Sequence, residues 1–369
     1  MNYKDKVTII LTLKGRKNFT IRYLTYLNEI QFPYKVLLAD GGDVNLEFQN
    51  FLENKNNFPN VDYQYIRYPE DNSLTTFYQK VSSVLQLVKT PYIMFNDNDD
   101  FPLPNGIAKS IEFLEKNKDY SAAGGRVAGV SYEINALGQE NCRWHKYYDD
   151  GELLPNGLEK NNAIDRIKCQ IVSHKSYSCY YHIIKTDSIR HIYDYILKYK
   201  LDCLTLHERF IIQSLLVFGK MKTFDDFYTY VRQRNTSEGA ASVSHFAKSL
   251  YLNNWMDKFD RYIVALSSLM LSVDQKQDQE IIALKIRNFY VTYEMNKDTP
   301  FTTKEKINLL ANHVVSFIDN KTRFRKEIPY YRKVTSYILF NITLYKRNSS
   351  DRFFYKKISD LITQKFNFF

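Results

Sequence analysis

The first 117 residues alternate between short apolar runs and longer segments in which apolar residues recur with helical spacing. We expect strands at residues 7–13, 35–39, 62–67 and 92–95, and helices at residues 17–30, 46–54, 73–88 and 104–117. Strict strand–helix alternation favours a mostly parallel sheet with helices on both faces. The sequence therefore predicts an α/β fold whose ligands bind at the carboxyl ends of the strands.

Three of the expected strands end in polar loops, at residues 12–16, 40–43 and 96–100. The third loop is the most unusual, because Asp97, Asp99 and Asp100 follow an apolar run directly. Crowded carboxylates repel one another, and burial makes the repulsion worse, so we expect a positive partner there. That partner is a divalent metal, a basic side chain or counter-ions; hard cations prefer oxygen ligands. The alternative is a solvated acidic turn in which Asp99 or Asp100 caps the following helix.

Several stretches together resemble family 2-type bacterial glycosyltransferases with the GT-A fold. The resemblance covers about residues 5–235 and rests on VTIILTLKGRKN (7–18), KVLLADGG (35–42), YQK (78–80), TPYIMFNDNDDF (90–101), PNGIAKSIEFLEKN (104–117) and HERF (207–210). It implies a GT-A-like catalytic domain that transfers a sugar from a nucleotide-diphosphate donor to a glycan or lipid-linked acceptor. It also implies help from Mn²⁺ or Mg²⁺ and a place in surface polysaccharide biosynthesis.

The resemblance assigns nucleotide-binding positions in the first two loops and on one helix. Thr12 and Arg16 match the loop that lines the nucleotide pocket, and Asp40 matches an acid that contacts the base. Many relatives have two adjacent acids at that turn, whereas this chain has Ala39 in the first position. Lys80 could face the phosphates; its alternative reading is an exposed helix lysine.

The resemblance also assigns the metal ligands and the catalytic base. Asp97 and Asp99 match the metal and diphosphate motif, so Asp97 counts among the nucleotide-sugar-binding residues too. Glu208 matches the acid that takes the proton from the acceptor hydroxyl, with His207 beside it. The alternative for Glu208 is a carboxylate in a helix first turn, where the helix dipole favours it. One base suffices for direct displacement, so we expect inversion at the anomeric carbon.

The remainder of the chain is less regular. We expect a strand around residues 122–133, loops over 135–165, a strand at 179–184, a helix at 207–218 and a last strand at 228–232. Residues 234–244 have the composition of a linker. The predicted organisation is a catalytic domain over residues 1–240 and a helical, basic region over residues 241–369. Arg126 and Arg232 are expected either to bind the diphosphate or acceptor, or to pair with structural carboxylates.

The net charge of +10 is unevenly distributed, since residues 320–369 hold 12 Lys/Arg and 3 Asp/Glu, a balance of +9. This basic, aromatic region is expected either to bind an anionic membrane surface or to pack as a helix on the catalytic domain. Nucleic acid is the less favoured partner, because no recognised binding module accompanies the charge. The four cysteines form no CxxC pair, and no apolar stretch could span a bilayer. We expect a cytoplasmic protein, with peripheral attachment to the inner face of the cell membrane as the alternative.

Two other classes of protein remain as alternatives. A haloacid-dehalogenase-type phosphatase also has Asp-x-Asp after a strand, but usually near the start of its fold and followed by Thr or Val. Here the motif is late and is followed by Asp100-Phe101. The second alternative is a non-catalytic membrane- or nucleic-acid-binding protein with a degenerate transferase site.

Overall fold

The computed structural model describes residues 3–134, 140–146, 156–172, 179–233, 255–274, 278–295 and residue 357. The strands are β1 (Val7–Leu13), β2 (Lys35–Asp40), β3 (Tyr63–Arg67), β4 (Tyr92–Asn96), β5 (Asp100–Pro102), β6 (Tyr120–Ile134), β7 (Glu140–Lys146), β8 (Ile183–Lys185) and β9 (Lys220–Gln233). The main helices are α1 (Lys17–Glu29), α2 (Leu46–Glu53), α3 (Leu74–Leu87), α4 (Pro104–Lys116), α5 (Ala163–Val172), α6 (Thr186–Lys198), α7 (Leu204–Phe218), α9 (Trp255–Val273) and α10 (Gln279–Phe289). Short helical turns are η1 (Lys55–Asn57), η2 (Asn156–Glu159), η3 (Cys179–Tyr181) and η5 (Tyr290–Met295).

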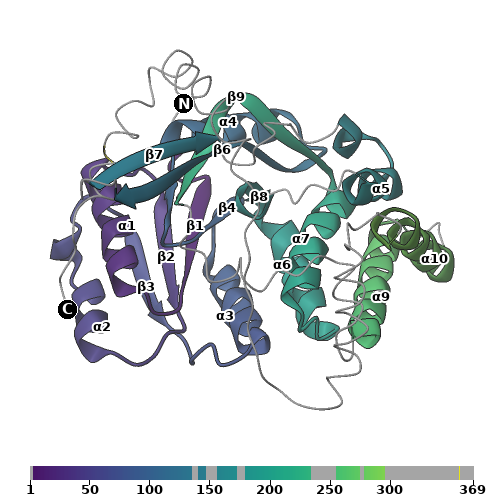
Figure 1. Ribbon diagram of the computed structural model, residues 1–369, viewed down its shortest axis with the longest axis horizontal. Coiled ribbons are helices and arrows are strands. Elements are labelled where there is room, and N and C mark those ends of the chain that lie inside the picture. The colour runs from purple at the N-terminus through teal and green to yellow at the C-terminus, as the bar shows by residue number, and fades with distance from the viewer. Residues whose placement is uncertain are drawn as a thin grey trace.

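The described strands form one mixed sheet in the order β3-β2-β1-β4-β8-β6-β9-β5, and β7 extends it by pairing with β6. Strands β3, β2, β1 and β4 are parallel, and β6 and β9 run in the same direction. Only β5, β7 and β8 run the other way. The mostly parallel α/β sheet flanked by helices, which the sequence predicts as GT-A-like, is confirmed (Figure 1).

Both faces of the sheet are covered, which explains why apolar residues dominate its central strands β1, β2 and β4. In β1, Ile9 and Leu11 pack with α1, α2 and α4, whereas Ile10 between them packs with α3, α6 and α7. In β4, Met94 faces the first group and Phe95 the second. Strands β1 and β4 therefore each contribute to two cores.

The direction of the chain connections reverses between β1 and β4. From β1 the chain moves to β2 and β3 on one side, while β4 pairs with the other side of β1. In open α/β sheets the crevice at such a switch point, beyond the carboxyl ends of the strands, is where ligands bind. The loops after β1 and β4 both lie at this point, as the sequence predicts.

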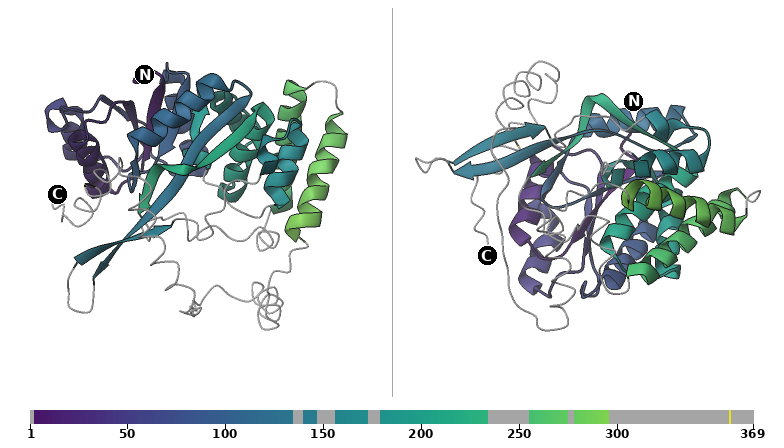
Figure 2. Two further views of the ribbon diagram at one scale, coloured as in Figure 1. Left: turned by 90° about the horizontal axis from the view of Figure 1, so that it is seen from above. Right: turned by 45° about the vertical axis from the view of Figure 1, so that its right-hand side comes forward.

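The second half departs from the sequence-based expectations in three places. Residues 135–165 were expected to be loops, but β7 pairs with β6 over residues 140–146 and forms a hairpin that projects from the body (Figure 2). The expected strand at 179–184 is instead the turn η3 followed by the short β8. Helix α6 follows and has no counterpart among the expected elements.

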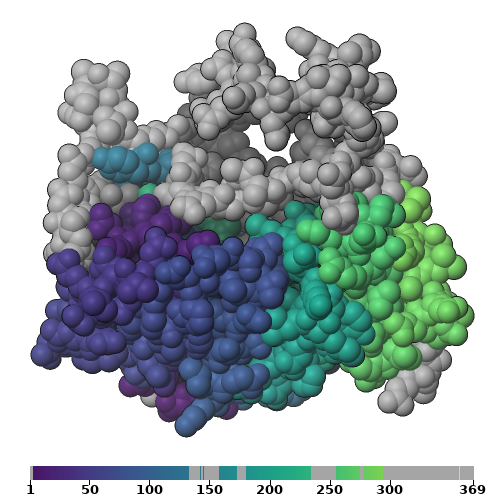
Figure 3. All heavy atoms as spheres, turned by 90° about the horizontal axis from the view of Figure 1, so that it is seen from below, coloured from purple at the N-terminus to yellow at the C-terminus, as the bar shows by residue number. Residues whose placement is uncertain are grey.

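The described helices of the C-terminal region pack on the rest of the protein. Residues of α9 and α10 belong to the same core cluster as α7, including Phe259, Tyr262 and Ile286. Figure 3 shows α7 and its neighbours in teal beside the green α9–α10 pair on one continuous surface. The boundary near residue 240 stays a prediction, and so does the membrane-binding tail, because residues 296–356 and 358–369 lie outside the described residues.

Candidate functional site

The loop after β1 turns sharply through two residues with positive φ. Gly15 has φ 68° and Arg16 has φ 58°, a conformation that costs a residue with a Cβ free energy. The carbonyl of Arg16 accepts the amide hydrogen bonds of Phe19 (3.0 Å) and Thr20 (3.2 Å), which starts α1. The turn brings the Arg16 guanidinium toward the loop after β4, where Nη2 lies 3.0 Å from Oδ2 of Asp99.

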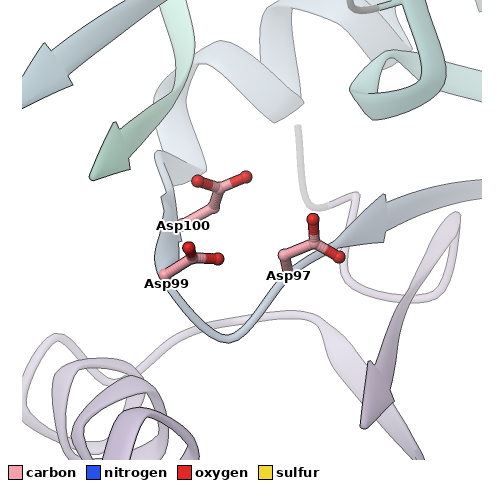
Figure 4. A group of neighbouring side chains, drawn as sticks. All are labelled: Asp97, Asp99 and Asp100. Carbon is pink, nitrogen blue, oxygen red and sulfur yellow. The ribbon is translucent and has the colours of Figure 1, made fainter. Parts of the chain in front are cut away.

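The loop after β4 gathers three carboxylates because its asparagines hold the backbone. Asn96 donates through Nδ2 to the carbonyls of Asp97 and Asp100, both at 3.2 Å. Asn98 donates to the hydroxyl of Thr20 at 3.1 Å. The three aspartates are thereby arranged around the short β4–β5 loop, with carboxylate oxygens within 4.8 Å of one another (Figure 4).

Protein groups already neutralise part of this cluster, so the basic side chains considered from the sequence are present. Arg232 of β9 lies with Nη2 3.3 Å from Oδ2 of Asp100, to which it is also paired across the strands. Its guanidinium packs over the ring of Tyr181, 4.5 Å from the centroid. The phenol of Tyr181 donates a hydrogen bond to Asp97. Arg232 therefore pairs with a carboxylate, as one of its two sequence readings expects, and that carboxylate belongs to the cluster.

Burial dominates the protonation behaviour of two of the aspartates. It raises the pKa of Asp100 well above its usual range; Asp97 and Asp99 add to the effect, and Arg232 opposes it. Burial also raises the pKa of Asp97, while the Tyr181 hydrogen bond opposes it. Positive charge beside these carboxylates, such as that of Arg232, favours their ionised forms.

The expectation that Asp99 or Asp100 caps the following helix is wrong. Helix α4 has Leu103 as its N-cap residue, with no side-chain capping hydrogen bond and Pro104 at its start. Asp100 instead begins β5, which separates the acidic loop from α4. A solvated turn is also ruled out for two of the three carboxylates, since Asp99 and Asp100 are only 5% and 1% exposed.

The donor set fits a divalent cation such as Mg²⁺ or Mn²⁺. Three carboxylates in one small volume supply the hard oxygen ligands that these ions prefer. Oδ1 of Asp100 is buried and has no hydrogen-bond partner among the described residues. Within that part of the chain, no other group of three or more acidic, His or Cys side chains converges in this way.

Thr12 and Asp40, which the sequence assigns to nucleotide binding, lie at the same carboxyl edge of the sheet as the acidic loop. Thr12 near the end of β1 is paired with Ala39, and Asp40 ends β2. Asp40 accepts hydrogen bonds from the Gly42 amide and the Tyr65 hydroxyl, both at 2.8 Å. Its carboxylate is thus fixed in orientation, which is what base recognition would need.

Lys80 is buried, which excludes one of the two environments considered from the sequence. It is not an exposed helix lysine, because it is 3% exposed. Its Nζ forms an ion pair with Asp71 and donates to the carbonyl of Leu13 at 3.0 Å. Burial lowers the pKa of Lys80, and the hydrogen bond that its Nζ donates to Asp71 opposes this. Contact between Lys80 and phosphate stays a prediction, while its contact with Asp71 ties α3 to the loop beside Asp40.

Glu208 lies on α7, one residue after the buried His207. Although Glu208 is exposed to solvent, desolvation by nearby protein raises its pKa; Arg232 and Arg209 oppose the rise, and Asp97 adds to it. Glu208 therefore lies within electrostatic range of Asp97 and Arg232. The structure brings this carboxylate to the same region as the acidic loop, across 111 positions of sequence.

Sequence reasoning missed three side chains of the region. Tyr181 donates a hydrogen bond to Asp97, and Asp71 forms an ion pair with Lys80. Arg22 is only 7% exposed and lies within electrostatic range of Asp99. Tyr181 falls in a segment interpreted as a strand, so nothing marked it as a ligand of the cluster. Asp71 lies nine residues before Lys80 in the sequence. Nothing in a single sequence shows that the two side chains are buried together as an ion pair. Arg126 is paired with Tyr228 between β6 and β9 and has other contacts.

His207 should make folding sensitive to mild acid. Its ring is fully desolvated, stacks on Tyr78 at 4.2 Å between centroids, and has a pKa lowered by burial from 6.5 to about 3. The unfolded chain therefore binds a proton first, and stability falls as the pH drops below 6.5 until about pH 3. Between pH 7.5 and pH 5.0 this group should cost about 2 kcal/mol.

Urea unfolding at the two pH values measures the effect. His207→Phe keeps an aromatic ring on Tyr78 and should lose about 2 kcal/mol of the pH sensitivity, whereas His191→Phe, at an exposed position, should keep it all. Contributions from the aspartates cancel in this comparison. Equal pH sensitivity in the wild type and His207→Phe would contradict the assignment.

Comparisons with known proteins give a fold likeness only. No family model and no curated protein matches the chain. Among solved structures, S. aureus TarS 1–349 matches with a TM-score of 0.48 and 12% identity, covering 84% of this chain and 80% of that one. The same fragment in complex with UDP-GlcNAc matches with a TM-score of 0.46 and 13% identity, over 84% and 81%. Against the longer TarS structure, this chain spans about half the length, 49%. At such identities side-chain roles do not transfer, so function is derived below from this chain's own residues.

No helix among the described residues is long and apolar enough to cross a bilayer.

Proposed function

We propose that this protein is a glycosyltransferase that moves a sugar from a nucleotide-diphosphate donor to a hydroxyl of a glycan or lipid-linked acceptor. The observation that carries the proposal is the acidic cluster at the switch point of the sheet, flanked by Arg16 and Arg232. Carboxylates alone would repel a diphosphate, and arginines alone would repel a metal ion and offer it no ligands. The combination suits a diphosphate bound together with a divalent cation.

The nucleotide is expected to bind along the ends of β1 and β2. Asp40 has a fixed carboxylate for a hydrogen bond to the base, and Thr12 lies beside it. Arg16 is placed between this region and the acidic loop, so it can reach a diphosphate with the donors that Asp99 does not use. The buried Lys80–Asp71 pair holds the loop beside Asp40 in place.

Asp97 and Asp99 are the proposed ligands of Mn²⁺ or Mg²⁺, with Asp100 beside them. When bound, such an ion neutralises the charge that develops on the departing diphosphate. The chain's own contribution is orientation: Asn96 and Asn98 fix the loop, and the Tyr181 phenol holds the carboxylate of Asp97. These contacts keep the ligand set in place before the donor arrives.

Glu208 is the proposed general base. A sugar hydroxyl is a weak nucleophile until its proton is removed, and a carboxylate with a raised pKa is better matched to that task than an ordinary one. As the acceptor oxygen attacks the anomeric carbon, its proton passes to Glu208 and the diphosphate leaves from the opposite side. Direct displacement of this kind inverts the anomeric configuration. The proposed role of the enzyme is in surface polysaccharide assembly. Its basic C-terminal region is proposed to attach it to an anionic membrane.

A donor screen tests the proposal. The protein is incubated with UDP-, GDP-, CMP- and ADP-linked sugars, including UDP-GlcNAc, with and without Mn²⁺, and released nucleotide is measured. We expect release from one nucleotide class, dependent on metal and absent in the Asp97→Asn/Asp99→Asn variant. Analysis of the product anomer then tests inversion. Binding to anionic vesicles or RNA with no nucleotide release from any donor would instead support the non-catalytic alternative.

A further inference from the structure

Positive and negative side chains balance around the acidic loop. Each carboxylate of the cluster lies near a guanidinium, and the six residues concerned are Asp97, Asp99, Asp100, Arg16, Arg22 and Arg232. Three formal negative charges thus face three formal positive charges. A divalent cation added alone would leave an excess of two positive charges in a largely buried space, which Coulomb repulsion disfavours.

Arg22 and Arg232 are fixed. Arg22 is 7% exposed, donates through Nη2 to Gln233, and packs with its guanidinium 4.6 Å from the centroid of Phe19 and 5.3 Å from that of Phe101. Burial lowers the pKa of Arg22 to about 10, so it remains charged at neutral pH. Arg232 belongs to a strand and approaches Asp100 through both Nε (3.4 Å) and Nη2 (3.3 Å).

Arg16 is held less firmly. It lies in the loop after β1 and contacts Asp99 through Nη2 alone, with its side chain 22% exposed. Its guanidinium stacks on Phe19 at 4.2 Å, a contact that does not depend on Asp99. Arg16 and Arg22 repel each other, and the negative charge of Asp99 offsets this repulsion. Of the three arginines, Arg16 can therefore leave its carboxylate with the fewest contacts broken.

We propose, building on the proposed function, that Arg16 is a placeholder cation on Asp99 which metal and nucleoside diphosphate displace together. Arg16 then pairs with the incoming diphosphate, and Oδ2 of Asp99, which Arg16 had contacted, can ligate the metal. The diphosphate offsets the added charge of the metal, so each ligand binds weakly alone and tightly in the presence of the other. Such mutual enhancement is a coupling free energy and must be reciprocal.

The test measures Mn²⁺ binding without nucleotide, from the electron paramagnetic resonance signal of free Mn²⁺, for the wild type and for Arg16→Gln. Glutamine removes the charge of Arg16. Because glutamine also has a Cβ, the cost of the positive φ at this position stays about the same. We expect Arg16→Gln to bind Mn²⁺ roughly tenfold or more tightly than the wild type, because one nearby positive charge is gone. Lys17→Gln, which removes a charge from the adjacent residue, should bind like the wild type. Arg16→Gln/Asp99→Asn should lose the gain.

UDP and GDP titrations with and without Mn²⁺ complete the experiment. In the wild type, metal should strengthen binding of the preferred nucleotide severalfold or more, and Arg16→Gln should show a smaller enhancement. Unchanged Mn²⁺ affinity in Arg16→Gln, with metal-dependent nucleotide binding in the wild type, would overturn the placeholder role alone. Absence of nucleotide binding under every condition would overturn the proposed function, while the Mn²⁺ arm would still decide whether Arg16 blocks Asp99.

Discussion

Replacing Glu208 by glutamine should lower kcat for sugar transfer by roughly 10²–10⁴-fold, the usual contribution of a positioned general base. Glutamine has nearly the same shape but cannot accept the proton of the acceptor hydroxyl. Glu208 is exposed on α7, so stability should change little. Donor affinity should also be kept, since the donor binds at the other carboxylates.

Steady-state kinetics and a donor titration on the same variant separate these effects. Because desolvation raises the pKa of Glu208, the wild-type kcat/KM should increase with pH through a value above the ordinary 4.5 of a glutamate, and Glu208→Gln should lack this limb. Glu112→Gln, at a charged position on α4, is the matched control and should behave like the wild type. A Glu208→Gln enzyme with wild-type kcat would eliminate Glu208 as the base.

Breaking the Lys80–Asp71 ion pair should destabilise the protein by about 3–5 kcal/mol, since removal of one partner leaves a buried charge uncompensated. Both side chains are almost completely inaccessible, at 1% and 3%. Lys80→Met keeps the length of the side chain but removes the charge beside Asp71. The loop also has no room to adjust, because a Cβ on Gly41 would lie 2.5 Å from the Asp71 carboxylate.

Lys116→Met is the matched control for this prediction. Lys116 also pairs with a carboxylate, Glu112, but its side chain is 65% exposed and solvent screens the pair. Its loss should therefore cost far less stability than the loss of the buried pair. Urea unfolding of both variants gives the comparison, and Lys80→Met/Asp71→Leu should recover part of the loss because no buried charge remains. Similar small losses in Lys80→Met and Lys116→Met would show that the buried pair contributes no more than a surface pair.

The first half of the fold could be predicted from the sequence because its strands are buried on both faces. Apolar residues dominate β1 and β4 for that reason, and the polar residues after β1, β2 and β4 mark the carboxyl edge of the sheet. Parallel order then places the Arg16 loop beside the Asp97–Asp100 loop. The second half lacks this regularity, since β7 lies in a projecting hairpin and β8 has only three residues.

Local signals could find the acidic residues but not their partners. Asp97 and Asp99 follow a recognisable apolar strand, whereas the groups that bind them are Tyr181 and Arg16, each more than 80 residues away. Such pairings depend on how the whole sheet is assembled. Lys80 shows the same limit in reverse: its helix was predicted correctly, yet its burial against Asp71 was not, because a lysine on a helix is usually exposed.

The central claim is that the acidic loop binds a nucleoside diphosphate together with a divalent cation. The most direct measurement is a thermal-shift titration of UDP, GDP, CDP, CMP and ADP, each with and without Mn²⁺, on the wild type and on Asp97→Asn/Asp99→Asn. We predict that one nucleotide stabilises the wild type only with metal, by about 2.7 kcal/mol at 100 times its dissociation constant, and does not stabilise the variant. Equal stabilisation of both proteins, or none of either by any nucleotide, would contradict the claim.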